Sequence, residues 1–423
     1  SMTEAECLLK SGAMYRHRIG LLPSLGGGEL IFVGVKPGGV SIYEGDAPIY
    51  HFDLEGRWQR AYLDDRHYLK ALDTTVVAVD RVREDQNLVL CRRTLPFAEA
   101  VDVDARVRDA AIDLAERLAR GQARVIAPPA NILSFPTEEL QNFLEGVASW
   151  DAAAWFRHRE RFSKVYGPWP LLAPDATQPI VVQASVGERS AVGFGGKPAH
   201  EHVALSVEEF RVHVAAVGEL WGRRIEQTRE IHLAGPDVLA RPAEEVESLL
   251  EVIGRELPMG EPGTRTARRI RAVVEEGERP PSHPVAVWKR FRERGLARVD
   301  IAVESLAPAA REQLGRAETP WDVAELWDTL GAAGLGRGLI LLTGLLPAQH
   351  LSSTLQLLEG LNFQATDLIA LLDARELGSV AESLLLNPSE ALRQRLAFKE
   401  ALEPLRQRQR FKVMVYDPDK RWT

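Results

Sequence analysis

The sequence is poor in cysteine, with only Cys7 and Cys91 among its 423 residues. Two thiols form at most one disulfide, which excludes a disulfide-stabilised scaffold, and they cannot supply three thiolate ligands at any site. A low cysteine content is typical of a protein from a reducing compartment. We therefore do not expect a disulfide between Cys7 and Cys91.

Long apolar runs are lacking as well. The longest, Leu339 to Leu346, falls far short of the roughly 20 residues that cross a bilayer, and it includes Gly344. The first residues, SMTEAECLLK, have neither the charged nor the apolar region of a signal peptide. We therefore expect a cytoplasmic protein that makes no membrane contact.

The sequence also lacks an excess of positive charge. The chain has 52 Lys and Arg against 60 Asp and Glu, a net charge of -8. Such a balance is not typical of a nucleic-acid binder. Two Arg-rich stretches, 265–271 and 406–410, keep RNA binding open as an alternative. Acidic residues flank the first of them, so the favoured interpretation of both is a solvated face.

The first part of the chain has the pattern of a β-rich domain. From about residue 14 to 95, short apolar runs alternate with Gly, Pro and Asp turns, which predicts a small antiparallel sheet. From about 104 to 165 the apolar spacing becomes helical, which indicates a helical connector. The predicted parts are an N-terminal β-rich domain (1–100), the connector (101–178), a barrel (179–380) and a C-terminal helix and strand (381–423).

Strands and helices alternate in the predicted barrel. Short apolar runs of the kind found in buried parallel strands occur six times, at 180–186, 230–234, 269–274, 298–303, 338–343 and 367–372. Six strand–helix units predict an α/β fold, a partial (β/α)6 parallel barrel.

Helix start and stop signals support this order. Ser206 and Glu209 have the spacing of a capping box, and Pro242 and Thr319-Pro320 are expected to open two further helices. In the tail, a helix over 389–402 is expected to end or kink at Pro404. A last strand over 411–416 could close its own domain or dock on the sheet edge of a partner.

Several runs of the sequence resemble one enzyme family in their order along the chain. They are IVVQASVGERSAVGFGGKP, REIHLAGPDVLARPAEEVESLL, RVDIAVES and GLILLTGLL, together with the N-terminal run FDLEGRWQRAYLDDRHYLKALD. Over most of its length the chain resembles the radical S-adenosylmethionine superfamily. The resemblance implies a barrel of that type, preceded by the leader domain of some uncharacterised members.

The sequence departs from this family at the cofactor loop. Members place three cysteines after the first strand to hold a 4Fe–4S cluster, and that register falls here on Glu188, Val192 and Gly195. Such clusters are held by thiolates, for which a carboxylate is a poor substitute, and the other two side chains have no donor atom. The resemblance therefore implies a degenerate member, with no cluster and no radical chemistry of its own.

Ligand sites of parallel barrels lie at the carboxyl ends of the strands. By resemblance, Gly235 and Pro236 lie where the family receives the methionine amino group. Glu304 and Ser305 lie where contacts to the ribose or methionine often arise, and Gly344 ends the fifth strand. These five are the candidate cofactor-binding residues, with S-adenosylmethionine as the implied ligand. The alternative is inherited geometry in which these groups are solvated or paired.

Three carboxylates at the strand ends, Glu188, Asp237 and Glu304, are candidate catalytic acids or bases. For Glu188 the alternative is a loop carboxylate in water, because most glutamates are exposed. His200 and His202 could hold a metal together, but no third ligand is evident, so no metal site is predicted.

Three functions follow as hypotheses. The favoured one is a non-catalytic scaffold or regulatory partner of another protein, with a cluster-bearing relative as the expected partner. The second is an enzyme or sensor whose barrel pocket binds S-adenosylmethionine or another nucleoside-like ligand without radical chemistry. The third is RNA binding.

Overall fold

The computed structural model describes residues 15–21, 30–84, 87–121, 123–125 and 137–418. The chain divides into two compact units. The first is formed by residues up to 165 together with 219–227, and the second by 166–218 and the chain from 228 onward. Cys91 is a free, exposed thiol. Cys7 lies outside the described residues, so the prediction about a disulfide stays a prediction.

Within the described residues, the first unit is built on an antiparallel sheet of nine strands in the order β8-β7-β6-β5-β4-β3-β2-β1-β9. The strands are β1 (Tyr15–Leu21), β2 (Leu30–Lys36), β3 (Gly39–Glu44), β4 (Ile49–Asp53), β5 (Trp58–Leu63), β6 (Arg66–Lys70), β7 (Val76–Glu84), β8 (Asn87–Thr94) and β9 (Ala123–Val125). The predicted antiparallel sheet is confirmed. Strand β6 was not predicted, because its sequence RHYLK is mostly polar and buries only Tyr68 and Lys70.

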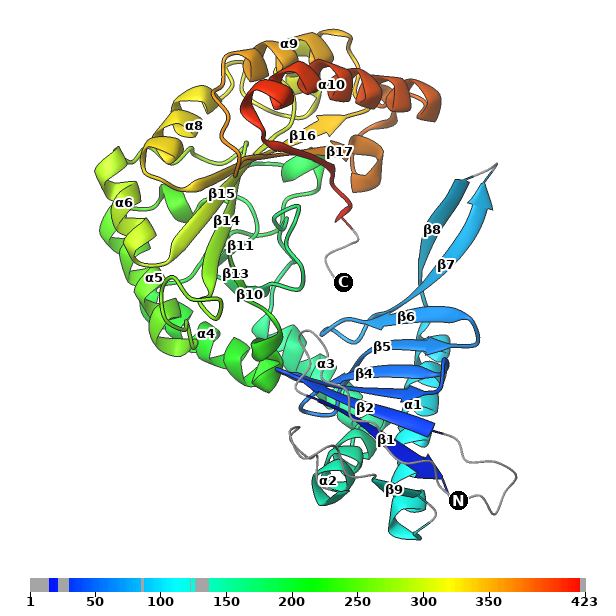
Figure 1. Cartoon of the computed structure of the whole chain (residues 1–423). Coiled ribbons are helices and arrows are strands. Elements are labelled where there is room, and N and C mark those ends of the chain that lie inside the picture. The colour runs from blue at the N-terminus through cyan, green and yellow to red at the C-terminus, as the bar shows by residue number, and fades with distance from the viewer. Residues whose placement is uncertain (1–14, 22–29, 85–86, 122, 126–136, 419–423) are drawn as a thin grey trace. The chain divides into compact units, whose positions relative to one another are not determined.

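The described part of this unit has three helices: α1 (Phe97–Ala119), α2 (Thr137–Ala148) and α3 (Ala152–Val165). Helix α1 lies against one face of the sheet (Figure 1). Val107 and Leu114 of α1 and Leu144 of α2 share one hydrophobic core with Phe52 and Trp58 of the sheet. The helices predicted as a connector therefore pack on the sheet because their apolar stripes need a face to bury against. The boundaries between the four predicted parts of the chain stay a prediction.

The second unit has seven parallel strands in the order β10-β13-β14-β15-β16-β17-β18. They are β10 (Ile180–Gln183), β13 (Glu230–Ala234), β14 (Arg269–Glu275), β15 (Leu296–Val303), β16 (Gly336–Thr343), β17 (Leu368–Asp373) and β18 (Lys412–Val415). A short hairpin, β11 (Ser185–Val186) and β12 (Val203–Ala204), follows β10. All six predicted barrel strands are present. The tail strand β18 extends the same sheet beside β17.

Helices alternate with these strands. They are α4 (Val207–Trp221), α5 (Ala243–Glu256), α6 (Val285–Glu293), α7 (Pro308–Gln313), α8 (Val323–Ala332), α9 (Gln349–Glu359) and α10 (Pro388–Gln409). The sheet curves, and α5, α6, α8 and α9 cover its convex side (Figure 1). The predicted α/β fold with a partial parallel barrel is confirmed.

The start of α4 carries the predicted capping box. The backbone N–H of Ser206 donates to Glu209 Oε1 at 3.0 Å, and the N–H of Glu209 donates to Ser206 Oγ at 3.2 Å. The prediction that α8 opens at Thr319-Pro320 is wrong. The helix begins at Val323, because the side chain of Asp322 caps it by accepting a hydrogen bond from the backbone N–H of Glu325.

The tail helix does not end at Pro404, since α10 runs through it to Gln409, while the alternative of a kink there stays a prediction. Proline removes one backbone donor from a helix, which is a local cost. Contacts on both sides of Pro404 offset it: Leu402 is buried, and Gln409 Oε1 accepts a hydrogen bond from the N–H of Phe363 at 2.6 Å.

Apolar side chains fill the concave side of the sheet along β15 to β17. Ala302, Ile340 and Leu372 from these strands form one cluster there with Phe194 and Tyr416. The space that these side chains leave open lies toward the other end of the strand order, beside β10, β13 and β14.

Candidate functional site

A cavity of about 310 Å³ lies at the carboxyl ends of β10, β13 and β14. Its polar lining comes from the strand ends and the loop after β10. It consists of Gln183, Ser185, Glu188, Lys197, His200, His232 and Glu275. Of the predicted site residues, Glu188, Gly235 and Pro236 line the cavity. Asp237, Glu304, Ser305 and Gly344 are not among the residues that line it.

Glu275 is the residue that sequence reasoning missed. It is the last residue of β14, one position beyond the predicted strand. Burial raises the pKa of Glu275 to about 8, and the nearby carboxylates of Glu188 and Glu304 add to this, while Lys197 opposes it. The carboxyl therefore carries its proton at neutral pH and can donate a hydrogen bond. A run of glutamates directly after a predicted parallel strand was the signal that could have found it.

His232 contributes a neutral ring to the same cavity. Its side chain is buried, and burial, followed by the charge of Arg271, lowers its pKa to about 3. Within the part of the chain that the structure describes, its Nδ1 has no hydrogen-bond partner. The cavity wall therefore combines an uncharged imidazole with a protonated carboxyl.

Asp237 fixes the loop after β10 instead of facing the cavity. Its carboxylate accepts hydrogen bonds from Ser185 Oγ at 2.7 Å, from His202 Nε2 at 3.2 Å and from Arg189 Nε at 3.3 Å. Burial by itself would raise the pKa of Asp237, but the bond from Ser185 and the charges of His202, Arg241 and Arg189 outweigh it, so the pKa lies below its usual value. Asp237 is therefore an ionised anchor.

Glu304 is paired with Arg316. Glu304 Oε1 accepts hydrogen bonds from Arg316 Nε at 3.0 Å and from a terminal nitrogen of the same guanidinium. Arg316 also donates to the carbonyls of Val192 and Gly193, at 3.0 and 2.9 Å, and to Ser190 Oγ at 3.1 Å. Burial raises the pKa of Glu304 although Arg316 opposes the shift. This buried pair ties the loop after β10 to the end of β15.

Ser305 and Gly344 are engaged in internal contacts. His350 Nε2 donates to the carbonyl of Leu342 at 2.7 Å, so its neutral ring accepts at Nδ1 from Ser305 Oγ at 2.8 Å. The backbone N–H of Gly344 donates to Gln394 Oε1 at 2.6 Å. Both residues hold outer helices to the ends of β15 and β16.

The three positions of the family's cluster ligands carry no thiol. Glu188 Oε2 accepts a hydrogen bond from the N–H of His200 at 2.8 Å. Gly195 has a φ of +71°, and its carbonyl accepts from Ser379 Oγ at 2.8 Å. Val192 offers no side-chain donor, and no cysteine follows residue 91 in the sequence. The donor set does not fit an iron–sulfur cluster, which requires thiolates.

The two histidines weighed as a metal pair take different roles. His200 lines the cavity, whereas the ring of His202 bonds to Asp237. Among the described residues there is no group of three His, Cys, Asp or Glu that could hold a metal ion.

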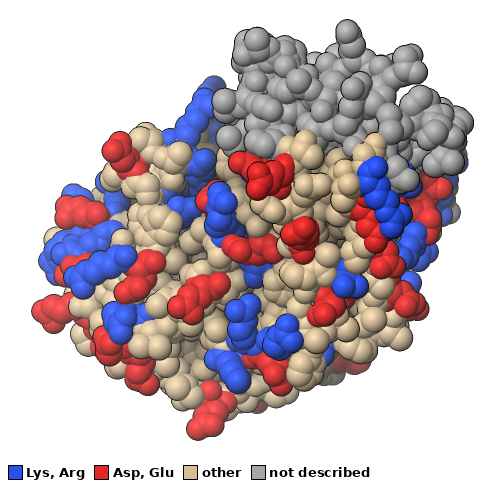
Figure 2. Space-filling view, turned by 90° about the horizontal axis from the view of Figure 1, so that it is seen from below, with Lys and Arg blue, Asp and Glu red and all other residues tan. Residues whose placement is uncertain are grey.

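Several arginines of the two Arg-rich stretches pair with acidic groups. Arg269 and Arg271 lie 2.8 Å from Glu230 and 2.6 Å from Asp175. In the second stretch, Arg406 lies 3.6 Å from Glu403. On the face shown in Figure 2, basic and acidic side chains are interspersed. Every helix within the described residues is too short or too polar to cross a lipid bilayer.

No protein family described by a sequence profile matches this chain, and neither does any curated protein. Solved structures do. The coproporphyrinogen III oxidase HemN from Escherichia coli, described as a radical SAM (S-adenosylmethionine) enzyme, is 16% identical with a TM-score of 0.33, over 48% of this chain and 44% of that enzyme. The chain therefore spans less than half of this enzyme's length.

Two further structures are similar. Streptococcus suis SuiB bound to S-adenosylmethionine is 8% identical with a TM-score of 0.38, over 84% of this chain and 72% of SuiB. The radical S-adenosylmethionine methyltransferase TsrM from Kitasatospora setae, with cobalamin and a 4Fe–4S cluster bound, is 9% identical with a TM-score of 0.32, over 52% of this chain and 36% of TsrM.

Proposed function

We propose that this chain is a radical-S-adenosylmethionine-like protein that holds no cluster of its own and acts as a non-catalytic scaffold or regulatory partner of another protein. One observation carries the proposal. The guanidinium of Arg316 joins Glu304 to the carbonyls of Val192 and Gly193. The loop in which relatives of this type hold their cluster is here a fixed part of the protein.

The energetics support a permanent structural role for this pair. Arg316 and Glu304 have side chains that are 2% and 0% exposed. Removing one partner of a buried ion pair costs about 3–5 kcal/mol, because the other charge stays buried without compensation. Opening the loop around a cluster would break the same contacts. The lack of thiolates and the buried pair therefore both argue against radical chemistry by this chain.

Anaerobic reconstitution tests the loss of chemistry. Purified protein is incubated with iron, sulfide and a thiol reductant, and bound iron and the visible absorbance of a cluster are measured. Cleavage of S-adenosylmethionine is then followed as 5′-deoxyadenosine formed in the presence of dithionite. We expect neither signal above that of the Arg316→Ala variant. A full cluster per chain together with turnover would overturn the proposal.

The partner role needs its own test. Protein purified from its native cells is expected to carry a second protein in fixed stoichiometry, and the expected partner is a cluster-bearing relative. Native mass spectrometry measures that stoichiometry directly. A strictly monomeric chain would count against the role of regulatory partner while leaving the result on the cluster unchanged.

A second candidate function is favoured by Glu275. This protonated carboxyl faces Glu188 and Lys197 in a cavity of about 310 Å³, which lies at the small end of the roughly 300–1,000 Å³ typical of small-molecule sites. A ligand with an ammonium or sulfonium group beside Glu275 would lower the pKa of this carboxyl and release its proton. S-adenosylmethionine and other nucleoside-like amines belong to this class. Gly235 lets the backbone come close to the ligand.

Calorimetric titration of S-adenosylmethionine in two buffers of different ionisation enthalpy tests this candidate. We expect saturable binding with proton release, lost in Glu275→Gln. Glu201→Gln, a change at an exposed carboxylate outside the cavity lining, serves as the matched control and should bind normally. Absence of heat in the unmodified protein, or equal binding by Glu275→Gln, would rule this candidate out.

A further inference from the structure

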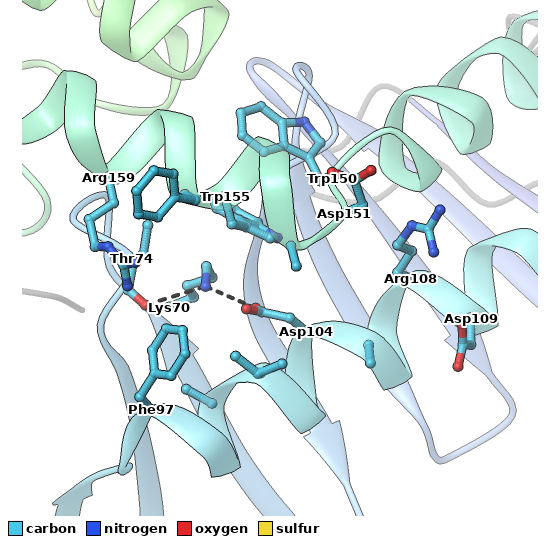
Figure 3. A pocket seen from close by; sticks show the side chains of 15 residues that line it. Lys70, Thr74, Phe97, Asp104, Arg108, Asp109, Trp150, Asp151, Trp155 and Arg159 are labelled. Carbon is cyan, nitrogen blue, oxygen red and sulfur yellow. Dashed lines mark hydrogen bonds and ion pairs between the residues drawn. The ribbon is translucent and has the colours of Figure 1, made fainter.

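The first unit contains a second cavity, of about 500 Å³, that the proposed function does not use. It lies between the facing sides of α1 and α3, and the end of β6 with the turn that follows closes its floor (Figure 3). Such a volume is within the range of small-molecule sites, roughly 300–1,000 Å³. The side chains that line the cavity indicate which class of ligand it would bind.

The floor is a fixed and neutralised ion pair. Lys70 Nζ donates to Asp104 Oδ1 at 2.9 Å and to the carbonyl of Thr74 at 3.3 Å, and Trp58 Nε1 donates to the same Asp104 oxygen at 2.8 Å. Lys70 Nζ also lies 4.1 Å from the centre of the Trp155 ring. Among the residues that the structure describes, Asp104 Oδ2 has no hydrogen-bond partner. It is therefore an acceptor available to a ligand.

The walls are aromatic. Phe97 of α1 and Phe156 of α3 are 67% and 51% exposed, although both line the cavity. The rings of Trp150 and Trp155 lie 4.7 Å apart, centre to centre. Large exposed apolar side chains gathered around a cavity are typical of binding sites. Aromatic faces in this arrangement suit a flat aromatic body, which can stack on them.

Arg159 places a cation beside the aromatic walls of this cavity, which Arg108, Asp109 and Asp151 also line. Its guanidinium carbon lies 5.2 and 5.5 Å from the ring centres of Phe97 and Phe156, and within the described part of the chain no carboxylate pairs with it. Asp151 Oδ1 accepts a hydrogen bond from the N–H of Ala154 at 2.9 Å. A guanidinium held in place by two rings presents its donors in the geometry that carboxylates and sulfonates match.

We propose that this cavity binds a small, flat aromatic anion. Its ring system lies against Trp155 between Phe97 and Phe156, its carboxylate or sulfonate pairs with Arg159, and a donor on the ring system reaches Asp104 Oδ2. Lys70 is not the anion's partner, because its three protons already face Asp104, Thr74 and the Trp155 ring.

Two fluorescent probes test this site on the full chain. 8-Anilinonaphthalene-1-sulfonate is a flat aromatic anion, and N-phenyl-1-naphthylamine has the same ring system without the charge. The sulfonate is expected to bind one site per chain, by fluorescence and calorimetry. Arg159→Gln should weaken the sulfonate roughly tenfold or more, the effect of one lost charge-assisted hydrogen bond, and change the neutral probe by less than about twofold.

The controls separate the site from general surface binding. Arg157→Gln changes an exposed arginine of α3 outside the cavity lining and should leave both probes unaffected. Ala105→Trp places a bulky ring in the cavity from an exposed position of α1, so it should abolish binding of both probes without lowering the unfolding midpoint.

Three results would overturn the proposal. The first is wild-type binding by Ala105→Trp. The second is equal weakening of both probes by Arg159→Gln, which would indicate an apolar site with no preference for anions. The third is a dimer that Ala105→Trp dissociates, since the cavity would then be covered by a second copy of the chain.

Discussion

Arg316 and Glu304 are joined through two nitrogens of the guanidinium at the carboxyl end of β15, with Nε 3.0 Å from Oε1. The same guanidinium donates to the carbonyls of Val192 and Gly193, in the loop after β10. One side chain thus connects a strand end to a loop more than a hundred residues away. We therefore expect the stability of this loop to depend on this pair.

Arg316→Ala should lower the free energy of unfolding by about 3–5 kcal/mol, because it leaves Glu304 buried without a partner. The double variant Glu304→Gln with Arg316→Met should lose less than Arg316→Ala alone, since no charge is left buried. Urea unfolding followed by tryptophan fluorescence measures both. Arg375→Ala removes a cation from an exposed pair with Glu382 and should change the value by at most ~1 kcal/mol. Equal losses for Arg316→Ala and Arg375→Ala would contradict this account.

The raised pKa of Glu275 predicts the pH dependence of stability. The pKa is about 8 in the folded chain against an ordinary value of 4.5, so between these values the folded state holds a proton that the unfolded state has released. The contribution of Glu275 to stability is therefore greatest below about pH 4.5 and is lost as pH rises to about 8. The slope contributed by one such proton is at most ~1.4 kcal/mol per pH unit.

Glu275→Gln should remove this contribution and be more stable than the unmodified chain above pH 8. The urea midpoint measured between pH 5 and 8.5 gives the slope for each protein. Glu201→Gln should keep the original slope. An identical slope in Glu275→Gln would mean that another group is responsible.

Gly195→Ala should destabilise the chain for two separable reasons. With a φ of +71°, a side chain at this position strains the backbone by about 1–2 kcal/mol. In addition, its Cβ would lie 2.4 Å from Leu377 Cδ1. Gly378→Ala is the matched control, because Gly378 has a φ of +68° and no atom lies within 4 Å of its added Cβ.

The difference between these two variants measures the clash with Leu377 alone. Leu377→Ala should relieve Gly195→Ala in part and leave Gly378→Ala unchanged. If the two glycine variants lose the same stability, Leu377 adapts and the loop is less constrained than its geometry indicates. A cysteine at 195 would meet the same two obstacles.

Phe411→Ala should cost about 3–5 kcal/mol, the range for removing a fully buried ring. Phe411 is 2% exposed and stacks on Phe363 with ring centres 4.3 Å apart, and it lies directly before β18. Leu392→Ala, on the exposed side of α10, should cost far less. A small loss for Phe411→Ala, measured by thermal unfolding, would show that β18 adds little to the sheet.

Local pattern predicted much of the fold. Each barrel strand is a short apolar run, a pattern that can be recognised from the local sequence alone. The capping box of Ser206 and Glu209 is likewise local, because it is formed within four residues. Pattern failed where the deciding contact is distant. Pro404 did not stop α10, since Gln409 bonds to Phe363 on another segment. The polar strand β6 was missed because only its neighbours in the sheet explain it.

The sequence by itself determined that the chain cannot supply three thiolate ligands, because a count of two cysteines is a matter of composition that no folding changes. Only the tertiary structure decided what the strand ends do. Glu304 and Glu275 lie at the carboxyl ends of adjacent strands, yet one is paired with Arg316 and the other lines a cavity. The physical reason is that a carboxylate's chemistry is set by burial and by charges brought to it from distant parts of the chain.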